Sequence, residues 1–145
     1  VFLLYLFGTV GANYLGRATD RRGRRSVLQV GLAVMVGGAL LSLPDNLALV
    51  LVGAAALTFG FFGSHAVASG WVGGLSSRGR AQTSALYLFA YHVGSAVVGF
   101  VGGILYGEHG WAGEVATVLV LLAVAVLVTL RLPRAAGHTE PPVAA

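Results

Sequence analysis

The sequence predicts an all-α membrane protein with five transmembrane helices, and three observations indicate this class. The 145 residues are 57% hydrophobic and only 10% charged, whereas about a quarter of the residues of a soluble domain are charged. Five long apolar segments alternate with short loops that carry turn residues or charges. All nine cationic residues are arginines, and they gather in the loops and at segment ends. We therefore expect one transmembrane domain over residues 1–132 and a disordered tail over residues 133–145.

The first two helices flank a basic loop. Residues 1–15 form the first apolar segment and residues 26–43 form the second. Ser26 is a suitable N-cap for the second helix, because a serine hydroxyl accepts hydrogen bonds from the first backbone N–H groups. The loop between them, residues 16–25, holds five of the nine arginines.

The third helix follows a tight turn. Pro44 ends the preceding helix, and either Asp45 or Asn46 can cap the next one, so we expect a helix over residues 47–71. The remaining two helices are expected over residues 81–106 and 115–132.

Arginine placement predicts the orientation. Loops 16–25 and 76–80 and the C-terminal end hold all nine arginines, while the opposite loops hold acids and a histidine. Short cytoplasmic loops accumulate Lys and Arg, so we expect both loops and the C-terminus in the cytoplasm. The positive net charge of +4 is then explained by the membrane topology, and we expect no nucleic-acid partner. Because cysteine is absent and the histidines are far apart in sequence, we expect neither a metal nor a cofactor.

The helices differ in kind. Small residues recur every four positions in the first and fourth segments, where they form grooves that let another helix backbone approach closely in a membrane. They are Gly8, Ala12 and Gly16 in the first segment, and Ser95, Gly99 and Gly103 in the fourth. The second and fifth segments are apolar nearly all round, as expected for helices that face lipid.

The third segment carries polar side chains along one face. Thr58, Phe62, His65 and Ser69 follow one another at steps of four, three and four, so they share one side of a helix. Polar groups inside a membrane usually face the bundle interior or a cavity. We therefore expect this helix to line a cavity.

The basic loop carries a family resemblance. GRATDRRGRRSVL resembles the loop signature of the major facilitator superfamily, usually written GxLaDrxGrkxxl, although Ala18 and Thr19 replace the usual leucine and small residue. The matching residues are Gly16, Asp20, Arg21, Gly23, Arg24, Arg25 and Leu28. A bare arginine run is also typical of nuclear localisation or phosphate binding, but apolar segments on both sides favour the transporter signature.

Departures from the family pattern favour its second half. The third predicted helix lacks the intramembrane arginine of a fourth helix, and Val98–Gly103 keeps only the final glycine pair of the GPxxGG pattern of a fifth helix. The resemblance thus implies helices eight to twelve, most of the second six-helix half. The chain also begins without methionine or a basic leader, so we expect a piece of a longer protein.

Two further segments resemble bacterial proton-linked efflux carriers of the arabinose-efflux-like or YnfM-like branch. These are Ser64 to Val72 and Arg78 to Phe89. The family resemblance implies that the loop is a conformational gate, with Asp20 docking at the N-terminus of a helix in the missing half. The alternative is that Asp20 only neutralises the neighbouring arginines.

Two histidines are candidates for substrate or proton contacts. His65 and His92 are the only ionisable side chains well inside predicted helices, and such groups are functional candidates by default. A neutral histidine can equally serve as a hydrogen-bonding group between helices. No Asp or Glu lies within a predicted span, so a coupling carboxylate would lie elsewhere in the protein. Tyr87 and Tyr91 either line the seam between halves or pack as interfacial aromatics.

The resemblance implies a secondary active transporter in the bacterial inner membrane, with proton-coupled efflux of a drug, sugar or amino acid. Its expected partners are the substrate, protons, the lipid bilayer and the missing N-terminal half. A membrane-embedded enzyme is a second class, but no cluster of acids, histidines or nucleophiles indicates a catalytic residue. A membrane interaction protein without transport activity is a third, for which the small-residue grooves alone suffice.

Overall fold

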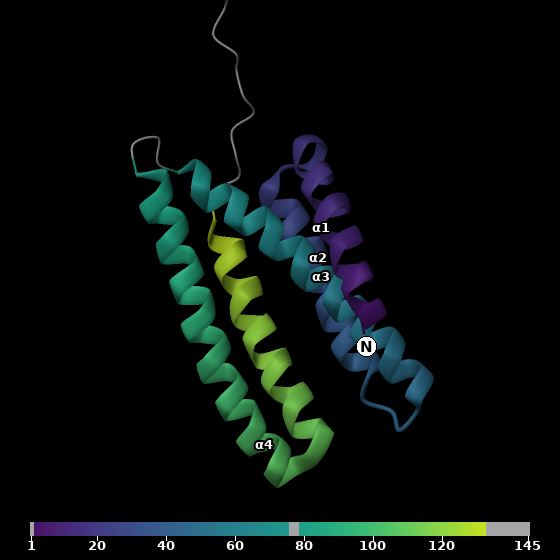
Figure 1. The fold of residues 1–145 in the computed structure, drawn as a ribbon. Helices are drawn as coiled ribbons and strands as arrows, with labels where there is room; N and C mark the ends of the chain where they lie inside the picture. The colour runs from purple at the N-terminus through teal and green to yellow at the C-terminus, as the bar shows by residue number, and fades with distance from the viewer. Residues whose placement is uncertain (1, 76–78, 133–145) are drawn as a thin grey trace, which may run out of the picture.

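The computed structural model describes residues 2–75 and 79–132, and this part of the chain folds into four helices. Their bounds are α1 (Phe2–Arg22), α2 (Arg24–Leu41), α3 (Leu47–Gly74) and α4 (Arg80–Arg131). The backbone of α4 breaks at Gly110, where φ is 64° and ψ is −153°. Its two arms, residues 80–109 and 111–131, fold back beside each other as a hairpin (Figure 1). The five predicted helices correspond to α1, α2, α3 and the two arms of α4.

Helices α2 and α3 form the centre of the bundle, since each of them contacts the other three helices. Within the described residues, α1 and α4 do not touch each other and lie on either side of α3. Phe62 of α3 contacts Tyr5 of α1, and Phe61 contacts Tyr91 of α4, with 6.2 Å between ring centroids in both pairs. One face of α3 therefore bridges α1 and α4.

Three helices of the described chain, α2, α3 and α4, are long and apolar enough to cross a membrane. Helix α4 has 52 residues, which is about 78 Å of helix and enough for two crossings of an apolar layer about 30 Å thick. The break at Gly110 divides it accordingly. Helix α1 is not among the three, because Asn13 and the charged residues of its last turns lower its mean hydropathy.

The ends of the elements separate the charges. Figure 1 shows the α1–α2 turn, the end of α3 and both outer ends of α4 at one end of the bundle, and the α2–α3 turn and the Gly110 bend at the other. The described arginines belong to the first end, whereas Asp45, Glu108 and Glu114 belong to the second. The structure thus keeps the charge asymmetry that the sequence predicts.

The predicted loop over residues 16–25 is helical except at Gly23. Helix α1 continues to Arg22, so its predicted end at residue 15 is wrong. Arginine is a good helix former, and cations near a helix C-terminus are favoured by the helix dipole. Thr19 also donates its hydroxyl hydrogen bond to the Gly16 carbonyl. Gly16 therefore lies inside α1, and Gly23 ends it.

Capping explains the next boundaries. Helix α2 begins directly after Gly23, which is its N-cap, so the prediction that Ser26 caps it is wrong. Asn46 caps α3, because its side-chain oxygen accepts hydrogen bonds from the N–H groups of Ala48 and Leu49 at 3.0 and 3.3 Å. The ends of α2, and the C-terminal end of α3, lie two to three residues from the predicted ones.

The second arm of α4 begins at residue 111, four residues before its predicted start, because Gly110 alone makes the turn. Glu114 therefore lies in the first turn of this arm and not in a loop. It is half-buried, and its carboxylate packs over Gly102 of the first arm. The structure therefore places three acids within helices, Asp20 in α1 and Glu108 and Glu114 in α4, although the predicted spans contained none.

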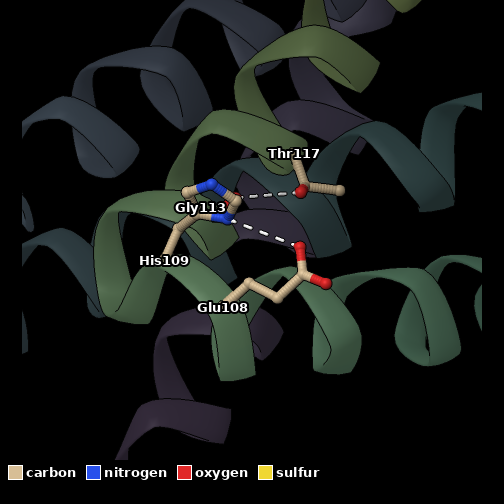
Figure 2. Close-up of polar contacts among 4 residues, drawn as sticks. All are labelled: Glu108, His109, Gly113 and Thr117. Carbon is tan, nitrogen blue, oxygen red and sulfur yellow. Dashed lines mark hydrogen bonds and ion pairs between the residues drawn. The ribbon is translucent and has the colours of Figure 1, made fainter.

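Polar groups at the bend are satisfied locally. Glu108 and His109 form an exposed ion pair with 3.9 Å between Oε2 and Nδ1, and Thr117 donates its hydroxyl hydrogen bond to the Gly113 carbonyl at 2.9 Å (Figure 2). An exposed ion pair contributes at most about 1 kcal/mol. Trp111 holds the bend to the rest of the bundle, because its indole Nε1 donates to the carbonyl of Ser42 at 2.8 Å.

Paired glycines bring α2 and α3 together. A Cβ on Gly60 would lie 2.6 Å from the Gly31 carbonyl oxygen, and one on Gly53 would lie 2.5 Å from that of Gly38. The two backbones thus touch at two points, about two helical turns apart. Val30 of α2 is 46% exposed and lines the groove beside α1, and the expectation that α2 faces lipid stays a prediction. The predicted tail, residues 133–145, lies outside the described residues.

Candidate functional site

The α1–α2 turn contains the predicted gate. Gly23 has a φ of 77°, which confirms the prediction of a positive φ, and its N–H bonds the Thr19 carbonyl at 3.0 Å. Asp20 is exposed in the last turn of α1, and no described arginine lies within 4.0 Å of its carboxylate. The C-terminal end of a helix is the negative end of its dipole. Asp20 therefore has no stabilising partner among the described residues.

Asp20 lies along a groove on the α1 side of the turn. The groove has a volume of about 930 Å³, and Asn13, Tyr14 and Arg17 line it beside Asp20. Tyr14 is 66% exposed. A surface with an exposed aromatic ring, an amide and an unpaired carboxylate is suited to receiving another protein segment.

Arg25 joins this turn to the C-terminal end of α4. Its Nη2 and Nη1 atoms donate hydrogen bonds to the carbonyls of Leu130 and Leu132 at 2.8 and 3.0 Å. The last carbonyls of a helix lack partners within it, and a cation there is favoured by the dipole. Arg21 and Arg24, by contrast, are exposed and bond no described residue. The predicted gating residues therefore divide into one structural clamp and several open side chains.

His65 lies in an aromatic cluster between α3 and the first arm of α4. Its Nδ1 is 3.0 Å from the hydroxyl oxygen of Tyr87, and its ring centroid is 4.8 Å from that of Tyr91. Phe61 stacks on the imidazole at 6.0 Å with an angle of 18° between the planes. His65 and Tyr87 are both half-buried, so a hydrogen-bonded polar pair is held among aromatic rings.

The other predicted cavity residues do not join this cluster through hydrogen bonds. Thr58 and Ser69 donate their hydroxyl hydrogen bonds to the carbonyls of Ala54 and Ala66 in their own helix, at 2.8 and 3.1 Å. His92 is exposed, its Nδ1 lies 2.7 Å from the Leu88 carbonyl oxygen, and its ring meets Tyr91 edge-on. The structure therefore unites His65 with two tyrosines and leaves His92 at their margin.

The predicted packing residues behave differently on the two helices. On α1, Gly8 lies against the ring of Phe62, and Gly11 lies against the backbone of Phe59. The α1–α3 contact thus uses Gly8 and Gly11, while Ala12 is half-buried and Gly16 has no atom near its absent Cβ. Gly8 is therefore a packing residue as predicted, while Gly11, three residues further on, takes the place predicted for Ala12.

On the first arm of α4, the predicted groove is open. Gly99 and Gly103 have no neighbouring atom near an added Cβ, and Ser95 is exposed. The glycine that does pack in this arm is Gly102, against Glu114. Among the described residues, no three His, Asp or Glu side chains gather closely enough to hold a metal ion.

Three contacts were missed by sequence reasoning. Tyr87 and Tyr91 lie four residues apart on one helical face, which signals a shared environment but not the partner, His65. The bonds of Arg25 and Trp111 to backbone carbonyls left no sequence signal, because a carbonyl is present at every residue. Such contacts depend on how far each helix extends.

Comparisons with known proteins agree with the bundle and the turn. The model of the Major Facilitator Superfamily matches residues 1–145. The chain is 38% identical over 125 residues to the uncharacterized MFS-type transporter YybF of Bacillus subtilis, covering 86% of this chain and 31% of that protein. It is 39% identical over 132 residues to the inner membrane transport protein YnfM of Escherichia coli, covering 91% and 32%.

A third relative is an uncharacterized transporter of Buchnera aphidicola from Schizaphis graminum, 30% identical over 132 residues, with coverage of 91% and 32%. The chain therefore spans about a third of the length of these relatives. No solved structure matches it. The match of the family model to all 145 residues, together with a wholly helical described structure and its apolar helices, shows that the chain is a multi-pass membrane protein of the major facilitator superfamily.

Proposed function

We propose that this chain supplies helices eight to twelve of a secondary active transporter that alternates access and exports a drug, sugar or amino acid in exchange for protons. Its partners in this proposal are the substrate, protons, the lipid bilayer and the N-terminal half of the same polypeptide. The coverage of only 31–32% of the relatives supports the presence of further helices. The family and the relatives' names point to a transporter and not to an enzyme.

We place the protein in the bacterial inner membrane with the α1–α2 turn and the C-terminus in the cytoplasm. The printed name of the E. coli relative, an inner membrane transport protein, supports the compartment. The gathering of the described arginines at one end of the bundle supports the orientation, because cytoplasmic loops are enriched in Arg and Lys.

The hydrogen-bonded pair of His65 and Tyr87 carries the proposal that α3 contacts substrate or protons. His65 lies nine residues from the end of α3, about 14 Å at 1.5 Å per residue, and thus well inside the span. Ionisable side chains at this depth are rare and mark substrate or proton pathways in membrane proteins. Imidazole can exchange a proton near neutral pH. When the hydrogen bond between His65 and Tyr87 breaks, the tyrosine hydroxyl can form a hydrogen bond with a substrate.

Asp20 supports the alternating-access mechanism. Its carboxylate is exposed at the negative end of the α1 dipole and lies along an open groove. A helix N-terminus from the other half, docked there in one state only, would stabilise that state by about 0.3 to 2 kcal/mol. This corresponds to a bias of roughly twofold to thirtyfold in the two-state equilibrium.

The first experiment measures export from cells with and without the intact gene, using labelled drugs, sugars and amino acids. Once a substrate is found, His65→Gln is compared with His92→Gln in membrane vesicles. Because His65 is paired inside the bundle and His92 is exposed, we expect a loss of roughly tenfold or more for His65→Gln and near-normal transport for His92→Gln. Equal effects of the two substitutions contradict the role of His65.

The gate is tested separately by Asp20→Asn in the intact protein. We expect a clear fall in transport rate at normal membrane levels, because the amide keeps the shape of the side chain and removes its charge. Unchanged transport at normal membrane levels contradicts the gating role of Asp20.

A further inference from the structure

A second hollow lies beside the α1–α2 turn and shares Arg22 with the Asp20 groove. It has a volume of about 400 Å³ and is lined by the turn itself, residues 22–26, by Gln29 and by Leu130 near the end of α4. Three arginines border it, and no acidic side chain does among the described residues. The hollow is therefore strongly positive.

The arginines of this hollow are unequally engaged. The guanidinium of Arg25 is committed to the carbonyls at the end of α4. Arg22 and Arg24 are exposed and make no hydrogen bond or ion pair with a described residue. Arg22 also occupies a variable position of the family's loop signature, so the gate does not account for it. Two guanidinium groups are thus available to an external anion.

The hollow continues into an apolar surface. Leu127 and Leu130 of the second arm of α4 are 62% and 50% exposed, and this arm lies beside α2. Both helices meet at the hollow through Arg25 and Leu130. A basic hollow at the end of an exposed apolar helix fits a molecule with an anionic head and hydrocarbon chains, because each part meets a matching surface.

The geometry points to a binding site for the phosphate headgroup of an anionic phospholipid in this hollow. Arg22 and Arg24 contact the phosphate oxygens, Ser26 and Gln29 supply neutral hydrogen-bond donors, and the acyl chains lie along the exposed leucines of the second arm of α4. Guanidinium groups suit this role, since their planar fork can bond two phosphate oxygens at once. A bound lipid there would rest against the same turn that carries Asp20.

The test uses the full-length protein that contains this chain, purified and reconstituted with phosphatidylglycerol, and native mass spectrometry to count retained lipid. We expect Arg22→Gln with Arg24→Gln to weaken phosphatidylglycerol retention by roughly five- to thirtyfold, from the attraction of about two cations to an anionic surface. Retention of phosphatidylcholine, which has no net charge, should not change. The matched control is Arg17→Gln with Arg80→Gln, which removes the same charge outside the hollow.

Each outcome decides the proposal. The proposal is supported if phosphatidylglycerol retention falls only in the variant with Arg22→Gln and Arg24→Gln, and is normal in the variant with Arg22→Lys and Arg24→Lys. Equal loss in the control variant overturns it, because net charge alone would then account for binding. Full displacement of phosphatidylglycerol by inorganic phosphate, at an ionic strength matched with chloride, overturns it in favour of a free-anion site.

A second measurement keeps both arginines in place, in case the double variant does not fold. Ser26→Cys, which lines the hollow, carries a fluorophore in the otherwise native protein. Phosphatidylglycerol bearing a spin label on its headgroup should quench this fluorophore several-fold more than similarly labelled phosphatidylcholine. Equal quenching by the two lipids overturns the proposal.

Discussion

At the scale of single residues, Gly23 controls the turn that carries the gate. Its φ of 77° and ψ of 147° lie near a region that only glycine occupies readily, and a side chain there costs about 1 to 3 kcal/mol. We therefore predict that Gly23→Ala lowers the free energy of unfolding by about that amount. Thermal unfolding of the purified intact protein, followed by circular dichroism, measures the change.

Gly16→Ala is the matched control. Gly16 is helical and has open space around an added Cβ, so alanine should leave stability unchanged or raise it by about 0.5 to 1 kcal/mol. If both substitutions lower the unfolding temperature equally, the special backbone of Gly23 is not the cause.

Two tyrosines of α4 give a second matched pair. The Tyr87 hydroxyl bonds Nδ1 of His65 at 3.0 Å, whereas the Tyr91 hydroxyl has no described hydrogen-bond partner. We predict that Tyr87→Phe costs about 1 kcal/mol of stability and that Tyr91→Phe costs less. Thermal unfolding of the two variants separates them, and an equal loss argues against the His65–Tyr87 bond.

The sequence foretold some residues of the candidate site and not others. The positive φ of Gly23 and the Asn46 cap follow from local chemistry, because a turn glycine and a capping amide act within a few residues. The pairing of His65 with Tyr87 depends on how α3 and α4 are rotated about their axes, which hydrophobic pattern alone does not fix. The same holds for Arg25, whose partners are backbone carbonyls.

At the scale of elements, the α2–α3 contact depends on glycine. Gly53 and Gly60 face carbonyl oxygens of α2 at 2.5 and 2.6 Å from an added Cβ. We predict that Gly53→Ala and Gly60→Ala each destabilise the protein by about 1 to 3 kcal/mol, because the two backbones must separate. Chemical or thermal unfolding in detergent measures the loss.

Gly70 is the control within the same helix. No atom lies within 4 Å of a Cβ added there, so Gly70→Ala should be neutral or slightly stabilising. A loss at Gly70 comparable to that at Gly60 points to a general effect of methyl groups on α3 and not to the helix contact.

Element boundaries were the least predictable part of the fold. The apolar segments predicted five helices, and the structure contains them. The arginines after residue 15, however, were predicted to form a loop, and they continue α1 instead. Charged residues end a membrane segment without ending a helix, since arginine has good helix propensity. The hydropathy pattern therefore indicates where each apolar segment ends, while Gly23 and Gly110 determine where the backbone turns.

At the scale of the whole molecule, the orientation makes a prediction that labelling can check. Ser26 and Asp45 are both exposed and belong to opposite ends of the bundle. With any cysteine elsewhere in the protein replaced, a membrane-impermeant maleimide should label Asp45→Cys in intact cells, and Ser26→Cys only after the membrane is opened. The opposite pattern contradicts the proposed orientation.

The clamp of Arg25 on the last turn of α4 also concerns how the protein is made. Arg25 and the carbonyl that it bonds at Leu132 are 107 residues apart. At a synthesis rate of about 5 to 20 residues per second, the guanidinium waits roughly 5 to 20 s before its partner leaves the ribosome. During biogenesis this contact therefore forms only once the end of α4 has been synthesised, when α1, α2 and α3 are already made.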